Sequence, residues 1–132
     1  MTGLYRYCIH TFRHSGVLSA QLAAGGGHVL TEHRSWVTGL RLQAAAQRLA
    51  ERMPLLFSAA ETEEQSGVIY WAVIDQVSVD AGIRQTRCSY SELRPVVPPR
   101  PLPALRLRNG GRPVSADLIR PYAICYTPDF LA

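Results

Sequence analysis

The sequence predicts an α+β domain, a compact mixed β-barrel of five or six strands with one main helix in the N-terminal half of the chain. Two observations support this class: short stretches with strand periodicity recur along the chain, and only one long stretch has helical periodicity. Sequential strands of this length close or pack more readily than they leave edges open, which favours a barrel. Residues 1–132, 47% of them hydrophobic, are enough for one core and are expected to form a single domain.

The first strand is predicted over residues 3–12, GLYRYCIHTF, because alternate residues there fall on two faces. The glycines at 25–27 predict a loop, because they interrupt any regular element. Their spacing matches neither a phosphate-binding nor a dinucleotide-binding loop. The proline-rich segment 97–103, VPPRPLP, predicts a crossing between strands, because proline donates no ladder hydrogen bond. Further strands are predicted over 54–60, 68–80, within 81–96, over 104–111 and over 120–128.

One amphipathic helix is predicted between Ser35 and Met53. Ser35 or Thr38 can cap its start, and Pro54 ends it at Met53. Its apolar face comprises Leu42, Ala45, Ala46, Leu49 and Met53. Its other faces carry Arg41, Arg48 and Arg52, which form either a solvated surface or a stripe that faces phosphate.

All 14 basic residues are arginines, and the sequence contains no lysine. Reactions that use a lysine amine as a general base, a nucleophile or a Schiff-base partner are therefore excluded. Residues 1–60 hold six arginines against Glu32 and Glu51, whereas residues 61–132 hold eight arginines against eight acids. The net charge of +4 thus comes from the first half of the chain, which is the better candidate for contact with phosphate.

The cysteines predict no metal site and no disulfide framework. Cys8, Cys88 and Cys125 are widely separated, each lies in a predicted strand, and buried reduced thiols are expected. No Cys-x-x-Cys pattern occurs and no cofactor motif is present. His10 and His14 have the His-x-x-x-His spacing, but the residues around them do not indicate a helix, so they are interpreted as ordinary polar positions. The N-terminal residues 1–12 lack the features of a signal peptide and no apolar run is long enough for a membrane span, so a cytoplasmic protein is expected.

The order of the predicted elements resembles the PUA-like superfamily, the small β-barrels that include PUA, ASCH and EVE domains. The likeness runs from the N-terminal strand through Ser35 and Trp36 before the helix to the strands LLFSAA and GVIYWAVIDQVSV. The C-terminal LRLRNGGRP and IRPYAICYTPDFL resemble the end of bacterial EVE-like modules. The resemblance implies binding of RNA or DNA, including a modified base, in a cleft that accepts an extruded base. Enzymatic ASCH-like relatives depend on a lysine, which this chain lacks.

Base binding of this kind requires a plane to stack on, polar groups for the base edge and positive charge along the backbone. Trp36 is the first candidate for stacking because its neighbours are polar, whereas Tyr70 and Trp71 lie on opposite strand faces, so that at least one belongs to the core. The full set of candidate base-binding and phosphate-binding residues is Trp36, Tyr70, Trp71, Tyr122, Arg13, Arg34, Arg41, Arg48, Arg112 and Arg120. Asn109, Gly110 and Gly111 predict a tight structural turn, and Arg112 and Arg120 can present guanidinium groups at the barrel mouth.

Two alternatives stay open at the level of the sequence. The chain can be a protein-interaction module in which RPVVPPRPLP is an extended docking segment. It can also be a small hydrolase that uses a histidine and a carboxylate, although a serine-nucleophile elbow is missing and Cys88 is the only thiol with an adjacent arginine. The residues available for that hydrolase are His10, His14, His28, His33, Glu32 and Asp75.

Overall fold

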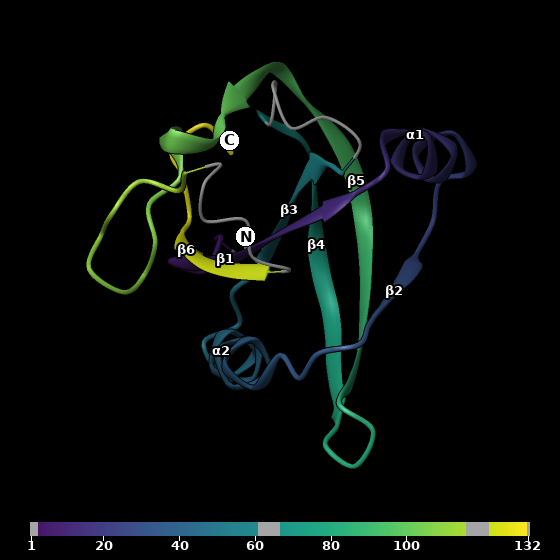
Figure 1. Cartoon of the computed structure of the whole chain (residues 1–132), viewed down its shortest axis with the longest axis vertical. Coiled ribbons are helices and arrows are strands. Elements are labelled where there is room, and N and C mark those ends of the chain that lie inside the picture. The colour runs from purple at the N-terminus through teal and green to yellow at the C-terminus, as the bar shows by residue number, and fades with distance from the viewer. Residues whose placement is uncertain (1–2, 61–66, 116–121, 132) are drawn as a thin grey trace.

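The computed structural model describes residues 3–60, 67–115 and 122–131, which form a six-stranded sheet and two α-helices (Figure 1). The elements are β1 (Tyr7–Arg13), α1 (Ser15–Ala24), β2 (His28–Glu32), α2 (Val37–Arg48), β3 (Pro54–Ala59), β4 (Gly67–Asp80), β5 (Gln85–Pro101), a 3-10 turn η1 (Leu102–Ala104) and β6 (Tyr122–Tyr126). The predicted α+β class is confirmed. None of the helices in the described residues is long and apolar enough to cross a membrane.

The sheet is open rather than closed into the expected barrel. Its strand order is β2-β5-β4-β3-β1-β6, with β1 and β3 parallel and the other neighbours antiparallel. The outer edge of β6 is hydrogen-bonded to the turn that precedes it. The backbone N–H of Arg108 donates to the carbonyl of Ile124, and the backbone N–H of Tyr126 donates to the carbonyl of Arg106. The long β4–β5 pair crosses β1 and β6 steeply in Figure 1. In the described part of the chain, β2 and β6 are therefore the two ends of the sheet.

Both faces of the central strands are buried, so two clusters of apolar side chains form. One cluster includes Ile9, Phe57 and Tyr90, together with Leu18 from α1 and Ala46 from α2. The other lies on the opposite face and includes Cys8, Leu56, Trp71, Leu105 and Leu131. Alternate residues of β1, β3 and β4 supply the two clusters in turn, which is the period expected of strands.

The helices differ from the prediction at two points. The sequence indicated one main helix, but residues 15–24 form a second, α1, of which only Leu18 is buried. The main helix α2 ends at Arg48 rather than at Met53, because Ala50 takes a left-handed conformation with φ of 53° and turns the chain before Pro54. Leu49 is consequently 62% exposed rather than part of the apolar face.

The proline-rich segment is the end of strand β5 instead of a separate crossing. Arg100 and Pro101 pair with Val68 and Gly67 of β4, and residues 96–99 bulge out where the register shifts. This end of β5 tolerates proline because β2 pairs only with residues 86–90, so that in the described part of the chain no strand adjoins the outer edge of β5 here. The predicted strand at 104–111 is also absent: the chain there makes isolated bridges and the expected tight turn, with φ of 81° and 66° at Gly110 and Gly111.

Helix α2 lies very close to β1, which fixes the position of its N-terminus. A methyl group added at Gly39 would lie 2.9 Å from the Cδ1 atom of Ile9, so only a glycine allows this approach without a shift of the isoleucine. The side chain of Gln43 donates to the carbonyl of Asp75 on β4 and ties the middle of the helix to the sheet. The start of α2 is thereby held beside β1 and β6.

Candidate functional site

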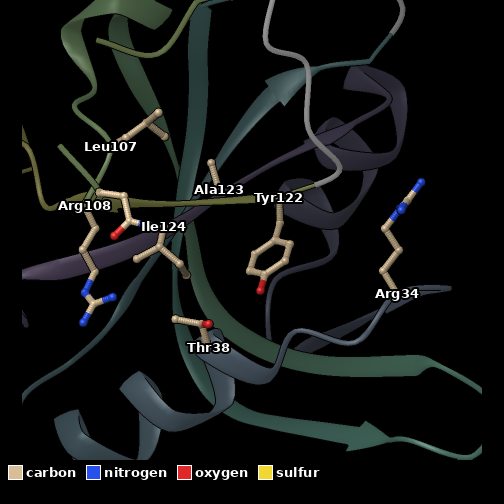
Figure 2. A pocket seen from close by; sticks show the side chains of 8 residues that line it. Arg34, Thr38, Leu107, Arg108, Tyr122, Ala123 and Ile124 are labelled. Carbon is tan, nitrogen blue, oxygen red and sulfur yellow. The ribbon is translucent and has the colours of Figure 1, made fainter. Parts of the chain in front are cut away.

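A cavity of about 360 Å³ lies where the start of α2, strand β6 and the turn before β6 meet. Eight residues line it: Arg34, Thr38, residues 107–109 and residues 122–124 (Figure 2). The three segments are far apart in the sequence, and the hydrogen bonds between Arg108 and Ile124 and between Tyr126 and Arg106 hold two of them together. The cavity is therefore a product of the tertiary fold.

Tyr122 forms an aromatic wall of this cavity. It faces Thr11 in the register of β6 with β1, and its ring stacks on that of Trp36 with centroids 4.8 Å apart and planes inclined by 20°. Burial raises the pKa of the Tyr122 hydroxyl, and a hydrogen bond with the Thr38 side chain opposes this rise. The ring is thus neutral at physiological pH, supported on one face by Trp36 and available to a ligand from the cavity.

Trp36 is not the exposed stacking residue that its polar neighbours suggested. Its side chain is 0% exposed, and its backbone N–H donates to Oγ1 of Thr86 at 2.9 Å as the chain enters α2. The indole Nε1 is buried without a partner among the described atoms. Glu32, His33 and Arg34 keep contact with solvent while Trp36 turns inward, so sequence polarity misplaced it. Trp36 acts on the cavity only through Tyr122.

The charge around the cavity is positive. Arg34 and Arg108 are exposed and stand on opposite sides of it, with Thr38, Tyr122 and Ile124 between them (Figure 2). None of the described residues that line the cavity is acidic. Neither arginine has an ion-pair partner among the residues that the structure describes. Arg108 instead places its guanidinium 5.0 Å from the centroid of the Tyr7 ring.

The remaining aromatic candidates belong to the core, away from this cavity. Trp71 is 5% exposed in the second cluster, with the guanidinium of Arg94 over its ring at 4.3 Å. Tyr70 is half-buried and packs against the first cluster. The expectation that these two side chains lie on opposite faces is confirmed, and both have structural contacts.

The other arginine candidates differ in their surroundings. Arg13 bonds to Glu32 at 2.7 Å, which neutralises it. Arg41 and Arg48 are exposed on α2, and Arg112 is exposed in the turn before β6. Arg120 lies outside the described residues. Of the predicted set, the structure therefore brings Arg34 and Tyr122 to the cavity, with Trp36 behind Tyr122.

Six of the eight lining residues were not among the candidates, and three of these six are polar: Thr38, Arg108 and Asn109. Thr38 was considered only as a helix cap, Asn109 only as a turn residue, and Arg108 received no role. The available signal was the alternation of Arg106 and Arg108 before the turn, which puts both guanidinium groups on one side of an extended segment.

Two of the described histidines, His10 and His28, are engaged by groups other than a carboxylate. His10 is 1% exposed and its Nε2 bonds to Oγ of Ser58 at 2.8 Å, while His28 bonds to the carbonyl of Gln21. Glu32 is already engaged by Arg13. Within the described residues, no group of three or more His, Cys, Asp or Glu side chains is placed to hold a metal ion.

The thiols are buried, as the sequence predicted. Cys8, Cys88 and Cys125 are each 0% exposed and free. Burial raises the pKa of both the Cys88 and the Cys125 thiol to about 12, so neither forms a thiolate at neutral pH. A cysteine nucleophile at Cys88 is therefore not supported by its surroundings.

A second, smaller hollow of about 200 Å³ lies over β2, β4 and β5. It is lined by Val29, Gln76, Ser78, Arg87 and Ser89. It offers one arginine but no aromatic ring, which makes it the poorer site for a planar ligand.

No protein-family model matches this chain, and no curated protein matches it either. The case for a function therefore depends on the geometry and chemistry of the cavity.

Proposed function

We propose that this chain is a non-catalytic nucleic-acid-binding module of the PUA-like kind, whose cavity accepts an unpaired or extruded base of RNA or DNA. The observation that carries the proposal is Tyr122, an aromatic ring supported by Trp36 at the wall of a cavity flanked by Arg34 and Arg108. A base stacks on such a ring, and guanidinium groups bind the phosphates on either side of it.

The other lining groups complement this chemistry. The Thr38 hydroxyl and the Asn109 amide can donate to or accept from the edge of a base, and an amide can read an edge at two points. The volume of about 360 Å³ is within the range of roughly 300 to 1,000 Å³ usual for small-ligand pockets. The same groups can distinguish a modified base from an unmodified one, because the distinction depends on which atoms of the base edge they reach.

Helix α2 extends the positive surface away from the cavity. Residues three and four apart share a helix face, so Thr38, Arg41 and Arg48 lie on one stripe that begins at the cavity and continues along α2. Arg41 and Arg48 are exposed and have no partner among the described residues. We expect this stripe to bind phosphates of the nucleic acid on the side of the cavity where α2 lies.

Replacement of both Arg41 and Arg48 by glutamine is expected to weaken the binding of single strands. The slope of log affinity against log salt should become shallower by roughly 1.4, because each lost phosphate contact accounts for about 0.7 in single strands. The measurement is a fluorescence-anisotropy titration of labelled single-stranded RNA, single-stranded DNA, and duplex DNA with and without modified cytosine, at roughly 50 and 200 mM salt. Salt-dependent binding of one of these classes supports the function, and flat titrations with all of them contradict it.

A second candidate, a protein-interaction module, is favoured by one observation. Val97 is 80% exposed at the centre of the bulge at residues 96–99, in the proline-rich end of β5. An exposed, extended, proline-rich segment of this kind suits docking to another protein. This candidate becomes the leading one if every nucleic acid fails to bind.

A further inference from the structure

A second aromatic cluster lies farther along β6 from the cavity. Tyr126 is 44% exposed, and its ring centroid is 5.3 Å from that of Tyr7, which faces it across the β1–β6 pair. Tyr5 packs edge-on against Tyr7, with ring centroids 5.8 Å apart. Tyr7 is thereby fixed, whereas Tyr126 offers part of its ring to solvent.

Two cations are held on this cluster. The guanidinium carbons of Arg6 and Arg108 are each 5.0 Å from the centroid of the Tyr7 ring, so they are no more than 10 Å apart. Both residues are exposed, and neither has a carboxylate partner among the described residues. Two unpaired guanidinium groups on one ring form a local positive patch, and arginine binds phosphate through paired N–H donors.

Arg108 connects this cluster to the cavity, because it lines the cavity and also lies on Tyr7. Alternate residues of a strand point to one face, so Tyr122, Ile124 and Tyr126 follow one another on the same side of β6. At about 3.3 Å per residue, Tyr122 and Tyr126 are separated by about 13 Å along the strand. One base cannot reach both rings, but a strand of several nucleotides can, and its phosphates then pass Arg108.

We infer that the bound nucleic acid runs as a single strand from the cavity along β6, with a phosphate held by Arg6 and Arg108 on Tyr7 and a neighbouring base stacked on Tyr126. This inference depends on the proposed function, which supplies the base at Tyr122. It adds that the ligand is a strand recognised at two successive points, and that a free base or nucleoside occupies only part of the site.

The test replaces Arg6 by glutamine, because Arg6 is exposed and does not line the cavity. A single-stranded trinucleotide should bind the variant about fivefold more weakly at 0.1 M salt, the loss expected for one phosphate contact in a single strand. Binding of the corresponding nucleosides, which carry no phosphate, should stay as in the wild type. The matched control is Arg87→Gln, which removes an exposed arginine that contacts neither the cavity nor Tyr7.

A second variant, Tyr126→Leu, examines the outer base separately. Loss of a stacked base costs about 1 to 3 kcal/mol, so trinucleotide affinity should fall at least fivefold while nucleoside affinity is unchanged. If Arg6→Gln and Tyr126→Leu bind the trinucleotide as tightly as Arg87→Gln does, the inference is overturned and the proposed function is left intact. Failure of the wild type to bind either probe would overturn both.

Discussion

Replacement of Trp36 by alanine is expected to lower the free energy of unfolding by about 3 to 5 kcal/mol, the range observed when a large buried aromatic side chain is truncated. Trp36 is among the largest fully buried side chains of the described chain, and it belongs to the first apolar cluster. It also stacks on Tyr122 and stands at the start of α2, so its loss leaves a cavity between helix and sheet. The effect is on stability because the indole has no exposed surface for a ligand.

The measurement is urea denaturation of the wild type and Trp36→Ala, monitored by far-ultraviolet circular dichroism. The neighbouring Val37→Ala serves as the control, since Val37 is 42% exposed and an exposed substitution changes stability by roughly 0.5 kcal/mol or less. Trp36→Phe should recover much of the loss, because phenylalanine fills part of the space and brings no N–H to bury. A loss with Trp36→Ala no larger than with Val37→Ala would contradict the buried position.

Acid is expected to destabilise the protein through His10. Burial lowers the pKa of His10 from its ordinary value of 6.5 to about 4, so the folded chain holds a proton there less tightly than the unfolded chain does. The stability that depends on neutral His10 is fully present above about pH 6.5 and is lost as the pH falls to about 4. At about 1.4 kcal/mol per pH unit, the loss over this window is about 3 kcal/mol.

This prediction is tested by measuring the free energy of unfolding from pH 7 to pH 4 for the wild type and for His10→Gln. Glutamine is neutral throughout and can still bond to Oγ of Ser58, the partner of the His10 ring. The wild-type curve should fall more steeply than that of the variant between about pH 6.5 and 4. Parallel curves over this interval would mean that His10 titrates alike in the folded and unfolded chains.

Local sequence patterns predicted much of the fold because they act over a few residues. Alternation in β1 and β4 and helical periodicity in α2 gave elements of the right kind. The end of α2 was misplaced because Ala50, and not Pro54, turns the chain. Helix α1 was missed because it buries only Leu18 and so has almost no amphipathic signal. The open sheet also escaped prediction, since it depends on the turn at 106–108 occupying the edge of β6.

The site was less predictable than the fold, because the cavity brings together residues from three distant segments. Tyr122 and Arg34 were identified by residue type alone. Trp36 and Trp71 have the same chemistry as a stacking residue, and only the tertiary packing shows that their rings are covered. Arg108 gains its place from the hydrogen bond between its N–H and Ile124, an interaction that no local pattern encodes.

The central claim is that a base stacks on Tyr122, and the most direct test compares Tyr122→Leu with Tyr122→Phe. Single-stranded oligonucleotides are titrated into each while the indole N–H signals of Trp36 and Trp71 are followed by NMR. In the wild type, the Trp36 signal should move and that of Trp71, in the other cluster, should not. Tyr122→Leu should lose about 1 to 3 kcal/mol of binding, whereas Tyr122→Phe retains the ring and most of the affinity. Equal affinity of the leucine variant and the wild type, with an unmoved Trp36 signal, would contradict the account.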